Sequence, residues 1–448
     1  MATISSTMPV TASRRNARMD PHVSSKRGLP FVWSLCAAST LLLGLTGCGS
    51  NDTAAPSPVA PSHAAAQAKT FSTFQAASVV VGQADFTSNV ANRGAAAGAN
   101  TLTVSYGNPA VGMGRLYVPD NSNARVLGYT TVPTTNGAAA NFVLGQPDFT
   151  TTSQLVTATG MFGPQTVVIY QGKLLVVDWN YNRVLIWNSL PTTTQAPADV
   201  VVGQPDMTNS ASGCTNSTLA NPESIAVVNG SLIVADGSNH RVLVWNTIPI
   251  TNGAAADMVG GQPDFTTCSA PATPSATSFA HPSDIASNGT QLALADPSNN
   301  RVLIWNTIPS CTPTPCAITT APDIVLGQPD FTSATANNGG ISATSLSTPF
   351  YLATDGTRLA VSDSLNNRVL IWNQFPSCTP VPCPSTTPPA VVLGQPDFVS
   401  STANNDGFGG SSVSAQSLKL SYGVFFNGPN QLIVVDSNNS RILIFNAQ

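Results

Sequence analysis

The sequence predicts an all-β fold, a six-bladed β-propeller of four-stranded antiparallel blades. Three observations lead to this prediction. Two short motifs each occur six times between residues 78 and 448, and the units that they mark contain short β-branched runs separated by Gly, Asn and Pro. The first unit also begins with a strand-like run that the last unit lacks. Only 8% of the residues are charged, which argues against coiled coils and long solvated helices.

The two motifs define the repeated unit. The first is Gly-Gln-Pro-Asp-Phe or a close variant, and its copies are 82–86, 145–149, 203–207, 261–265, 327–331 and 394–398. The second is Asp-x-x-Asn-x-Arg or a close variant, and two aliphatic residues follow the Arg in every copy. Its Asp and Arg positions are Asp120 and Arg125, Asp178 and Arg183, Asp236 and Arg241, Asp296 and Arg301, Asp363 and Arg368, and Asp436 and Arg441. Self-similarity at such a period indicates a repeat architecture.

Each unit contains four candidate strands. In the third unit these are 224–228, 231–235, 241–245 and 258–261, and an Asn-Gly turn at 229–230 separates the first two. Short β-branched runs between turn residues are typical of an antiparallel meander. One such sheet per unit, repeated radially, is a propeller blade.

The two ends of the repeat region predict how the ring closes. The run 79–86 corresponds to a fourth strand but precedes every other part of a unit, whereas the last unit stops after its third strand at 442–445. We therefore expect 79–86 to complete the last blade, which removes exposed sheet edges. A stacked solenoid is the alternative, but it requires distinct polar caps.

The motifs also carry a family resemblance. The Asp-x-x-Asn-x-Arg-Val pattern, preceded by strands such as Leu-Ile-Val-Ala-Asp, resembles the NHL-repeat family over roughly residues 78–448. The Gly-Gln-Pro-Asp-Phe element resembles a bacterial lipoprotein subset of that family. The resemblance implies a six-bladed propeller. It does not imply one function, because the family includes interaction domains, sensor domains and a few enzymes.

The repeated Arg and aromatic residues are expected to be structural. Each Arg is predicted to tie the Asp-x-x-Asn turn to neighbouring structure, including the Asp of Gly-Gln-Pro-Asp, and a ring of ligand-binding Arg is the alternative. An aromatic residue follows the Arg in every unit: Tyr129, Trp187, Trp245, Trp305, Trp372 and Phe445. These rings are expected to pack between neighbouring blades, and a carbohydrate platform is the alternative.

Residues 1–47 are predicted to be a bacterial lipoprotein signal peptide. Lys26 and Arg27 form a basic start, the uncharged run 29–45 follows, and Leu-Thr-Gly-Cys ends at Cys48. This ending resembles a lipobox, in which Cys48 takes a diacylglycerol and becomes the new N-terminus. An uncleaved membrane anchor is the alternative, since the apolar run is close to the shortest length that spans a bilayer.

The signal predicts an address for the rest of the chain. Residues 48–77, rich in Ala, Pro and Ser, are expected to be a flexible tether, and 78–448 the propeller. No Asp follows Cys48 directly, which favours the outer membrane of a bacterial envelope. The propeller then lies outside the cytoplasm.

The cysteines are consistent with an oxidising compartment. Three disulfides are expected: Cys311–Cys316, Cys378–Cys383 and Cys214–Cys268. Each of the first two lies within the connection between the third and fourth strands of its unit. The third joins residues that follow Gly-Gln-Pro-Asp in consecutive units, so it is expected to bridge adjacent blades.

A ligand site is expected on the innermost strands, because residues beside a repeated proline differ between units. These residues include Gln165, Glu223, His281, Asp284, Phe350 and Tyr351. Glu223, Asp284 and His281 are the speculative metal ligands, and the carboxylate pair would suit Ca²⁺. A solvated channel wall is the alternative. A three-His zinc site is not expected, because only His281 of the three His residues after Cys48 falls near the axis.

These observations favour a membrane-anchored lipoprotein whose propeller binds an envelope protein or a glycan, with no cofactor, as a monomer. Nucleic acid is not an expected partner: the formal net charge is −4, and five of the 17 basic residues precede Cys48. One alternative is a channel-site hydrolase or lyase that depends on Ca²⁺. Another is a structural envelope protein with no small ligand.

Overall fold

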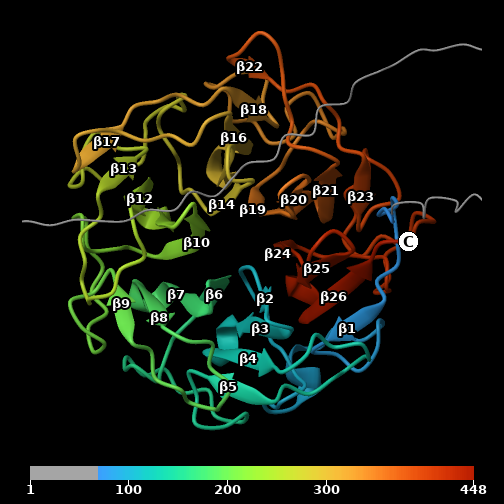
Figure 1. Cartoon of the computed structure of the whole chain (residues 1–448). Helices are drawn as coiled ribbons and strands as arrows, with labels where there is room; N and C mark the ends of the chain where they lie inside the picture. Colours follow the sequence, from blue (N-terminus) through green and yellow to red (C-terminus); the bar gives the residue numbers. More distant parts are fainter. Residues whose placement is uncertain (1–68) are drawn as a thin grey trace, which may run out of the picture. The chain divides into compact units, whose positions relative to one another are not determined.

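A computed structural model describes residues 69–448 of the chain. Six sheets surround a central axis, as Figure 1 shows, and the predicted six-bladed β-propeller is confirmed. The predicted signal peptide, Cys48 and most of the predicted tether lie outside the described residues. Within 69–448 no helix is long and apolar enough to cross a membrane.

The blades follow one another in sequence, each from an inner to an outer strand. Blade 1 contains β2 (Ala110–Gly112), β3 (Arg115–Asp120), β4 (Arg125–Tyr129) and β5 (Phe142–Leu144). Blade 2 contains β6 (Pro164–Tyr170), β7 (Lys173–Asp178), β8 (Arg183–Trp187) and β9 (Val200–Val202). Blade 3 contains β10 (Pro222–Val228), β11 (Ser231–Asp236), β12 (Arg241–Trp245) and β13 (Met258–Gly260).

The second half of the ring repeats this order. Blade 4 contains β14 (Asp284–Ser287), β15 (Leu292–Asp296), β16 (Arg301–Trp305) and β18 (Ile324–Leu326). Blade 5 contains β19 (Pro349–Thr354), β20 (Leu359–Asp363), β21 (Arg368–Trp372) and β23 (Val391–Leu393). Blade 6 contains β24 (Ser421–Phe426), β25 (Gln431–Asp436), β26 (Arg441–Asn446) and β1 (Val79–Val81).

Short 3-10 turns join the second and third strands. They are η2 (Asn121–Asn123), η3 (Trp179–Tyr181), η4 (Gly237–Asn239), η5 (Pro297–Asn299), η6 (Ser364–Asn366) and η7 (Ser437–Asn439). One more turn, η1 (Ala91–Gly94), lies between β1 and β2.

The ring closes as the sequence predicts. β1 pairs antiparallel with β26, and Val80 lies opposite Leu443. In Figure 1 the blue β1 lies beside the red β26. β1 has three residues rather than the predicted eight, because Gly82 adopts φ +88° and turns the chain away.

Two blades carry a fifth strand that the sequence did not predict. β17 (Cys316–Ile318) pairs parallel with β13 of blade 3, and β22 (Cys383–Pro384) pairs parallel with β18 of blade 4. Each comes from the connection between the third and fourth strands of the following blade. The prediction of four strands per blade is therefore correct for four of the six sheets.

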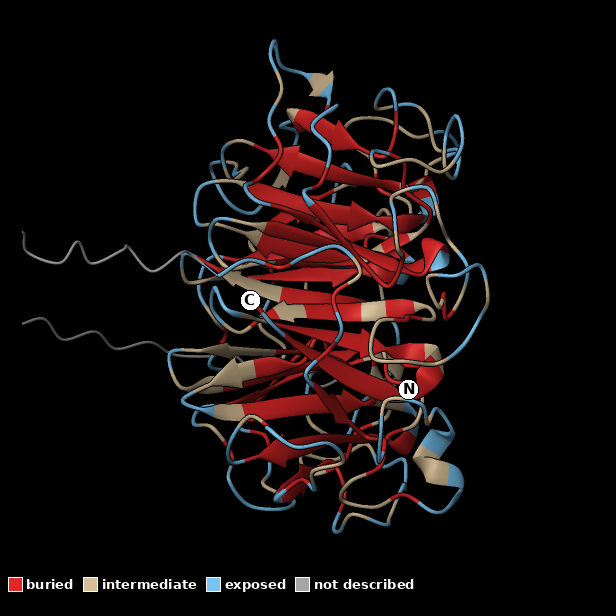
Figure 2. Ribbon diagram, turned by 90° about the vertical axis from the view of Figure 1, so that its right-hand side faces the viewer, coloured by how far each residue is buried: buried red, intermediate tan, exposed pale blue. Residues whose placement is uncertain are grey.

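The core consists of six apolar clusters, each between two neighbouring blades. Figure 2 shows buried strands and exposed connecting loops. All six aromatic residues after the motif Arg are at most 4% exposed and belong to these clusters. The indole Nε1 of Trp245 donates to the carbonyl of Ala254, so even its polar atom is satisfied inside the protein. These rings form no exposed platform.

The motif Arg side chains are buried and hold the turns together. In blade 3, Arg241 Nε donates to Asp236 Oδ2 at 2.8 Å, Nη1 donates to the carbonyl of Phe265, and Nη2 donates to two loop carbonyls. The same arrangement recurs in every blade. The expected contact with the Asp of Gly-Gln-Pro-Asp is wrong. That Asp, for example Asp264, is exposed and accepts the backbone N–H of Thr266 instead.

The Gln of Gly-Gln-Pro-Asp makes the link that was assigned to its Asp. Gln146 Nε2 donates to the carbonyl of Ala124 in the neighbouring turn (2.8 Å) and to that of Ser153 (2.7 Å). In blade 2 the turn departs from the motif, because Tyr181 occupies the Asn position. There the guanidinium of Arg183 lies 5.3 Å from the centroid of the Tyr181 ring.

The residues just before β1 pack against the propeller. Thr70 and Gln448 exchange two backbone hydrogen bonds of 3.0 Å. The Phe71 ring packs on Phe426, and the guanidinium of Arg358 lies over both rings. The packed part of the chain therefore begins earlier than residue 78.

Candidate functional site at one mouth of the axial channel

The candidate site lies where the inner strands begin. In β6, β10, β19 and β24 the pairing with the second strand shifts register at this end, so one or two residues bulge from each ladder. The bulged residues include Gln165, Glu223, Phe350 and Tyr422. A bulge re-aims side chains and is over-represented beside active sites. Here it brings residues that differ between blades to one place.

A cavity of about 320 Å³ occupies this mouth. It is lined by Tyr106, Asn121, Gln165, Trp179, Glu223, Phe350 and Tyr422. The Tyr422 ring packs edge-on against Tyr106 at 4.9 Å and Phe350 at 5.0 Å, between ring centroids. These aromatic residues come from blades 5 and 6 and from the start of blade 1. The polar groups come mainly from blades 2 and 3, so the cavity has an aromatic side and a polar side.

Glu223 is the centre of the polar side. Its side chain is only 5% exposed, and Oε1 accepts hydrogen bonds from Trp179 Nε1 at 3.0 Å and from His281 Nε2 at 2.8 Å. Because a carboxylate only accepts, the amide nitrogen of Gln165 faces it and donates to Oε2 at 3.0 Å. Three side chains from different elements thus fix the orientation of this carboxylate.

His281 couples Glu223 to the protein surface. Burial lowers the pKa of His281, but the hydrogen bond and charge of Glu223, together with the charge of Asp296, raise it above its ordinary value. The backbone N–H of His281 donates to His240 Nδ1 at 3.1 Å. Burial and the nearby His281 charge lower the pKa of His240. Protonation at this pair of imidazoles therefore favours His281.

A buried polar plug lies below the mouth. Asp284, from blade 4, is 1% exposed, and its carboxylate accepts from Asn108 Nδ2 at 2.9 Å, from the Leu352 backbone N–H at 2.7 Å and from the Ser224 hydroxyl. Unlike the motif Asp residues, it forms no ion pair with any side chain of residues 69–448. Burial raises the pKa of Asp284 to about 6, although these hydrogen bonds act in the opposite direction.

Asn108 connects this plug to the other blades. It lies just before the inner strand of blade 1, diametrically opposite Asp284. Its Oδ1 accepts from the Val424 N–H at 2.8 Å, and its carbonyl accepts from the Val167 N–H at 2.9 Å. With Ser224 and Leu352, the network draws a group from each of the six blades.

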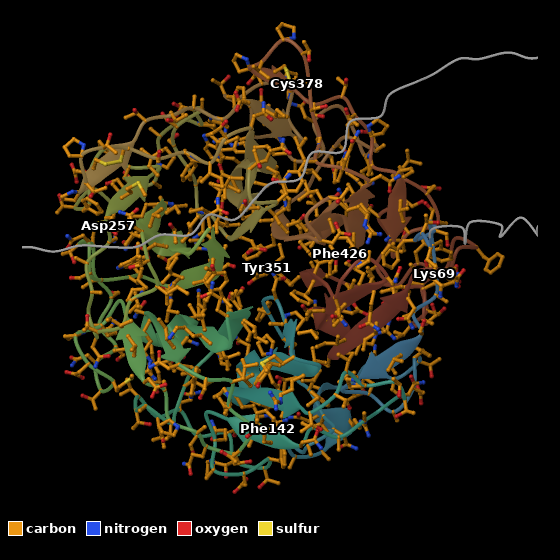
Figure 3. All side chains as sticks on the ribbon, in the orientation of Figure 1. Lys69, Phe142, Asp257, Tyr351, Cys378 and Phe426 are labelled. Atoms are coloured by element: carbon orange, nitrogen blue, oxygen red, sulfur yellow. A yellow bond between two sulfur atoms is a disulfide. The ribbon has the colours of Figure 1, made fainter. Side chains whose placement is uncertain are left out.

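A second link also crosses the axis. The hydroxyl of Tyr351 in blade 5 lies 2.7 Å from the side-chain amide of Gln165 in the opposite blade 2. Figure 3 shows Tyr351 close to the centre of the ring. The two crossing links separate the mouth from a second cavity of about 250 Å³ toward the other face, which includes Asn108 and Asp284 among its lining residues.

Two glycines allow the backbones to meet at the axis. A Cβ at Gly107, which has φ +89°, would lie 2.4 Å from the Gln165 carbonyl carbon. A Cβ at Gly423 would lie 2.1 Å from the Gly107 carbonyl oxygen. Both contacts are too short for any other residue, so the plug depends on glycine at these positions.

The structure separates the speculative metal ligands. Glu223 and His281 contact each other at the mouth, whereas the oxygens of Asp284 are used within the plug. Residues 69–448 contain no group of three His, Cys, Asp or Glu side chains that could hold a metal ion. The Ca²⁺ hypothesis therefore stays a prediction, without a group of three such ligands among the described residues.

Sequence reasoning missed three important residues. Trp179 lies inside the second motif, directly after Asp178, at a position that the motif leaves variable. Asn108 and Tyr106 precede the inner strand of blade 1. Pro109 lies 11 residues before the motif Asp120, whereas the equivalent Pro164 lies 14 residues before Asp178. This shorter spacing was the available signal, because a departure from a repeat marks a position that has a separate role.

All three disulfides form as paired in the sequence analysis. Cys214–Cys268 links the segments that follow blades 2 and 3. The two bridges that each span five residues close the hairpins from which β17 and β22 arise. Figure 3 labels Cys378 on the second of these hairpins, at the rim.

Comparison with known proteins agrees with this architecture. The NHL repeat model matches residues 219–245, which include β10, β11 and β12. No curated protein is similar enough to match the chain.

Three solved structures are similar at low identity. A streptogramin B lyase has a TM-score of 0.40 and 11% identity, over 77% of this chain and 94% of that one. A protein of unknown function from Bacteroides thetaiotaomicron has a TM-score of 0.43 and 11% identity, over 84% and 75%. The WD40 β-propeller domain of Doa1 has a TM-score of 0.40 and 9% identity, over 83% and 97%. Together with the geometry above, the match to the repeat model identifies the chain as a six-bladed β-propeller that carries an NHL repeat.

Proposed function

We propose that this propeller is a non-catalytic binding module and that its ligand is a glycan of the cell envelope. The main support is that residues which break the sixfold repeat gather in one cavity. Tyr106, Phe350 and Tyr422 form its aromatic side, and Glu223 with Gln165 forms its polar side. The repeated residues form the scaffold, and the residues that differ between blades form the site.

The chemistry of a sugar ring suits this cavity. A pyranose has an apolar C–H face, which stacks on aromatic rings, and a rim of hydroxyl groups that donate and accept hydrogen bonds. Glu223 is held by three donors, so it accepts a sugar hydroxyl without rearrangement. Asn121 adds an amide with both donor and acceptor atoms. A largely preformed pocket with few polar groups is typical of small-ligand sites.

Titration calorimetry of the full chain with a panel of peptidoglycan and surface-polysaccharide fragments tests this proposal. We expect Tyr422→Ala and Glu223→Gln to weaken binding at least tenfold. Tyr170→Ala, at the far end of β6, is the matched control and should leave binding unchanged. Binding that is equal in Tyr422→Ala and in the unmodified chain would refute the mouth as the site.

The Glu223–His281 pair supports a second candidate, a hydrolase or lyase acting at the same mouth. A carboxylate that raises the pKa of an imidazole at 2.8 Å is an arrangement used in general acid–base catalysis. Turnover of a bound fragment that Glu223→Gln abolishes, while binding persists, would favour the enzyme over the binding module.

The proposed address rests on the sequence before the propeller. Cys48 and the apolar run before it support a lipid-anchored location in a bacterial envelope. Membrane fractionation tests this location. The envelope partner is proposed on the same basis.

A further inference from the structure

We propose that the interface between blades 3 and 4 holds a second binding site, for a neutral apolar small molecule. A cavity of about 260 Å³ opens there, within the apolar cluster that joins the two blades. This site is separate from the proposed glycan site, because the two cavities share no lining residue.

The cavity results from one departure in a repeated position. In every blade the second residue of the third strand pairs with the last residue of the fourth strand. In blade 3 this pair is Val242 and Gly260. The equivalents of Gly260 are Leu144, Val202, Leu326, Leu393 and Val81. An aliphatic side chain therefore fills this place in five interfaces and is missing in one.

The missing side chain opens the core. Val242 is 8% exposed, whereas every equivalent residue is 0% exposed. The equivalents are Val126, Val184, Val302, Val369 and Ile442. The ring of Phe279 lies 3.9 Å from the place of a Cβ at Gly260, but a cavity of about 260 Å³ remains beside it.

The walls are apolar and the rim is uncharged. Phe279, Trp305 and Ile285 belong to the inner surface, and Trp305 Nε1 already donates to the carbonyl of Thr320. The polar side chains that line the cavity are Asn229, Ser231, Asn246 and Ser310. Within the described part of the chain no Lys, Arg, Asp or Glu lines it, so a charged headgroup would find no partner.

A disulfide and a strand pairing fix the outer wall of the cavity. Ile308 and Ile318 line the cavity from the hairpin that Cys311–Cys316 closes, and β17 fixes that hairpin to β13 of blade 3. The equivalent hairpin of blade 5 covers blade 4 in the same way, but there Leu326 fills the space. The wall is thus common to two interfaces, and only the one with Gly260 leaves a cavity.

The size sets the class of ligand. An apolar cavity of about 150 Å³ accepts one benzene molecule. At about 260 Å³ this cavity has room for a neutral molecule the size of a bicyclic aromatic or a medium-length aliphatic chain.

The probe 1-naphthylamine tests the site, because it is a neutral bicyclic aromatic whose fluorescence emission shifts to shorter wavelength when it leaves water. With the full chain we expect saturable binding of one equivalent. Gly260→Leu should weaken it at least tenfold, and Gly260→Ala by a smaller factor. An added Cβ at Gly260 meets no atom closer than 3.8 Å, so we expect Gly260→Ala to fold normally.

Two control variants distinguish binding in this cavity from binding elsewhere on the protein. Ile250→Ser removes an exposed apolar side chain and should not change probe binding. Tyr422→Ala alters the proposed glycan site and should also leave probe binding unchanged. Loss of glycan binding and loss of probe binding therefore report on the two proposals separately. The inference is overturned if the probe does not saturate, or if it binds Gly260→Leu as tightly as the unmodified chain.

Discussion

Replacing Asp284 by Asn changes the charge of the axial plug but keeps its shape. The Asn carbonyl oxygen can accept from Asn108 Nδ2 and from the Leu352 N–H, as Asp284 Oδ2 does. Its amide nitrogen then faces the Ser224 hydroxyl, which turns to accept. The substitution therefore isolates the effect of the buried charge.

The magnitude follows from the pKa. Burial raises the pKa of Asp284 from 3.8 to about 6, so the folded state binds its proton more tightly than the unfolded state does. Such a group adds stability at acid pH, and this contribution is lost as the pH rises from about 4 to about 6. A shift of this size corresponds to about 3 kcal/mol. Asp284→Asn should gain about that much relative to the unmodified chain between pH 4 and pH 7.

Guanidinium unfolding followed by tryptophan fluorescence, repeated between pH 4 and pH 8, measures the difference. Asp148→Asn is the matched control, because hydrogen bonds from Thr150 lower the pKa of exposed Asp148 to about 2. It should leave the pH dependence unchanged over this range. Parallel stability curves for Asp284→Asn and the unmodified chain would refute the reasoning.

Three further predictions concern the frame and the anchor. Arg241→Met leaves Asp236 buried without its cation and should lower the free energy of unfolding by about 3–5 kcal/mol in denaturant titrations, an effect much reduced if Asp236→Asn is added. Replacing Cys214 and Cys268 by Ser releases a loop of 54 residues and should cost about 4 kcal/mol, against about 2 kcal/mol for either five-residue bridge; equal losses would contradict the loop-entropy account. Cys48→Ala should move the protein from the membrane to the soluble fraction on cell fractionation, and unchanged sedimentation would show that Cys48 is not the anchor.

The frame was predictable because it is local and repeated. The spacing of Asp236 and Arg241 within one turn sets their contact, and the six copies make the pattern visible. The pairing of β1 with β26 in blade 6 was predictable because the repeat region begins with a fourth strand and its last unit stops after a third. Strand positions in the third unit agree with the structure to within two residues.

The site was only partly predictable, since its contacts cross the ring. Asn108 and Asp284 are 176 residues apart, and their pairing depends on two glycines that let the backbones approach. Glu223 was named because it lies beside a repeated proline, but its partner Trp179 lies within the second repeated motif, at a position that the motif leaves variable. The fifth strands were unforeseen because parallel pairing joins two different units.

The shared sixth blade has a consequence for biosynthesis. Of the described strands, β1 is the first to leave the ribosome, and its partner β26 is the last. Domains of many proteins fold during synthesis, N-terminal parts first, but this sheet can be assembled only after β26 has been translated. Until then the edge of β1 and the apolar face of blade 5 that packs on blade 6 have no neighbour, so we expect a prematurely terminated chain to be prone to aggregation and to proteolysis.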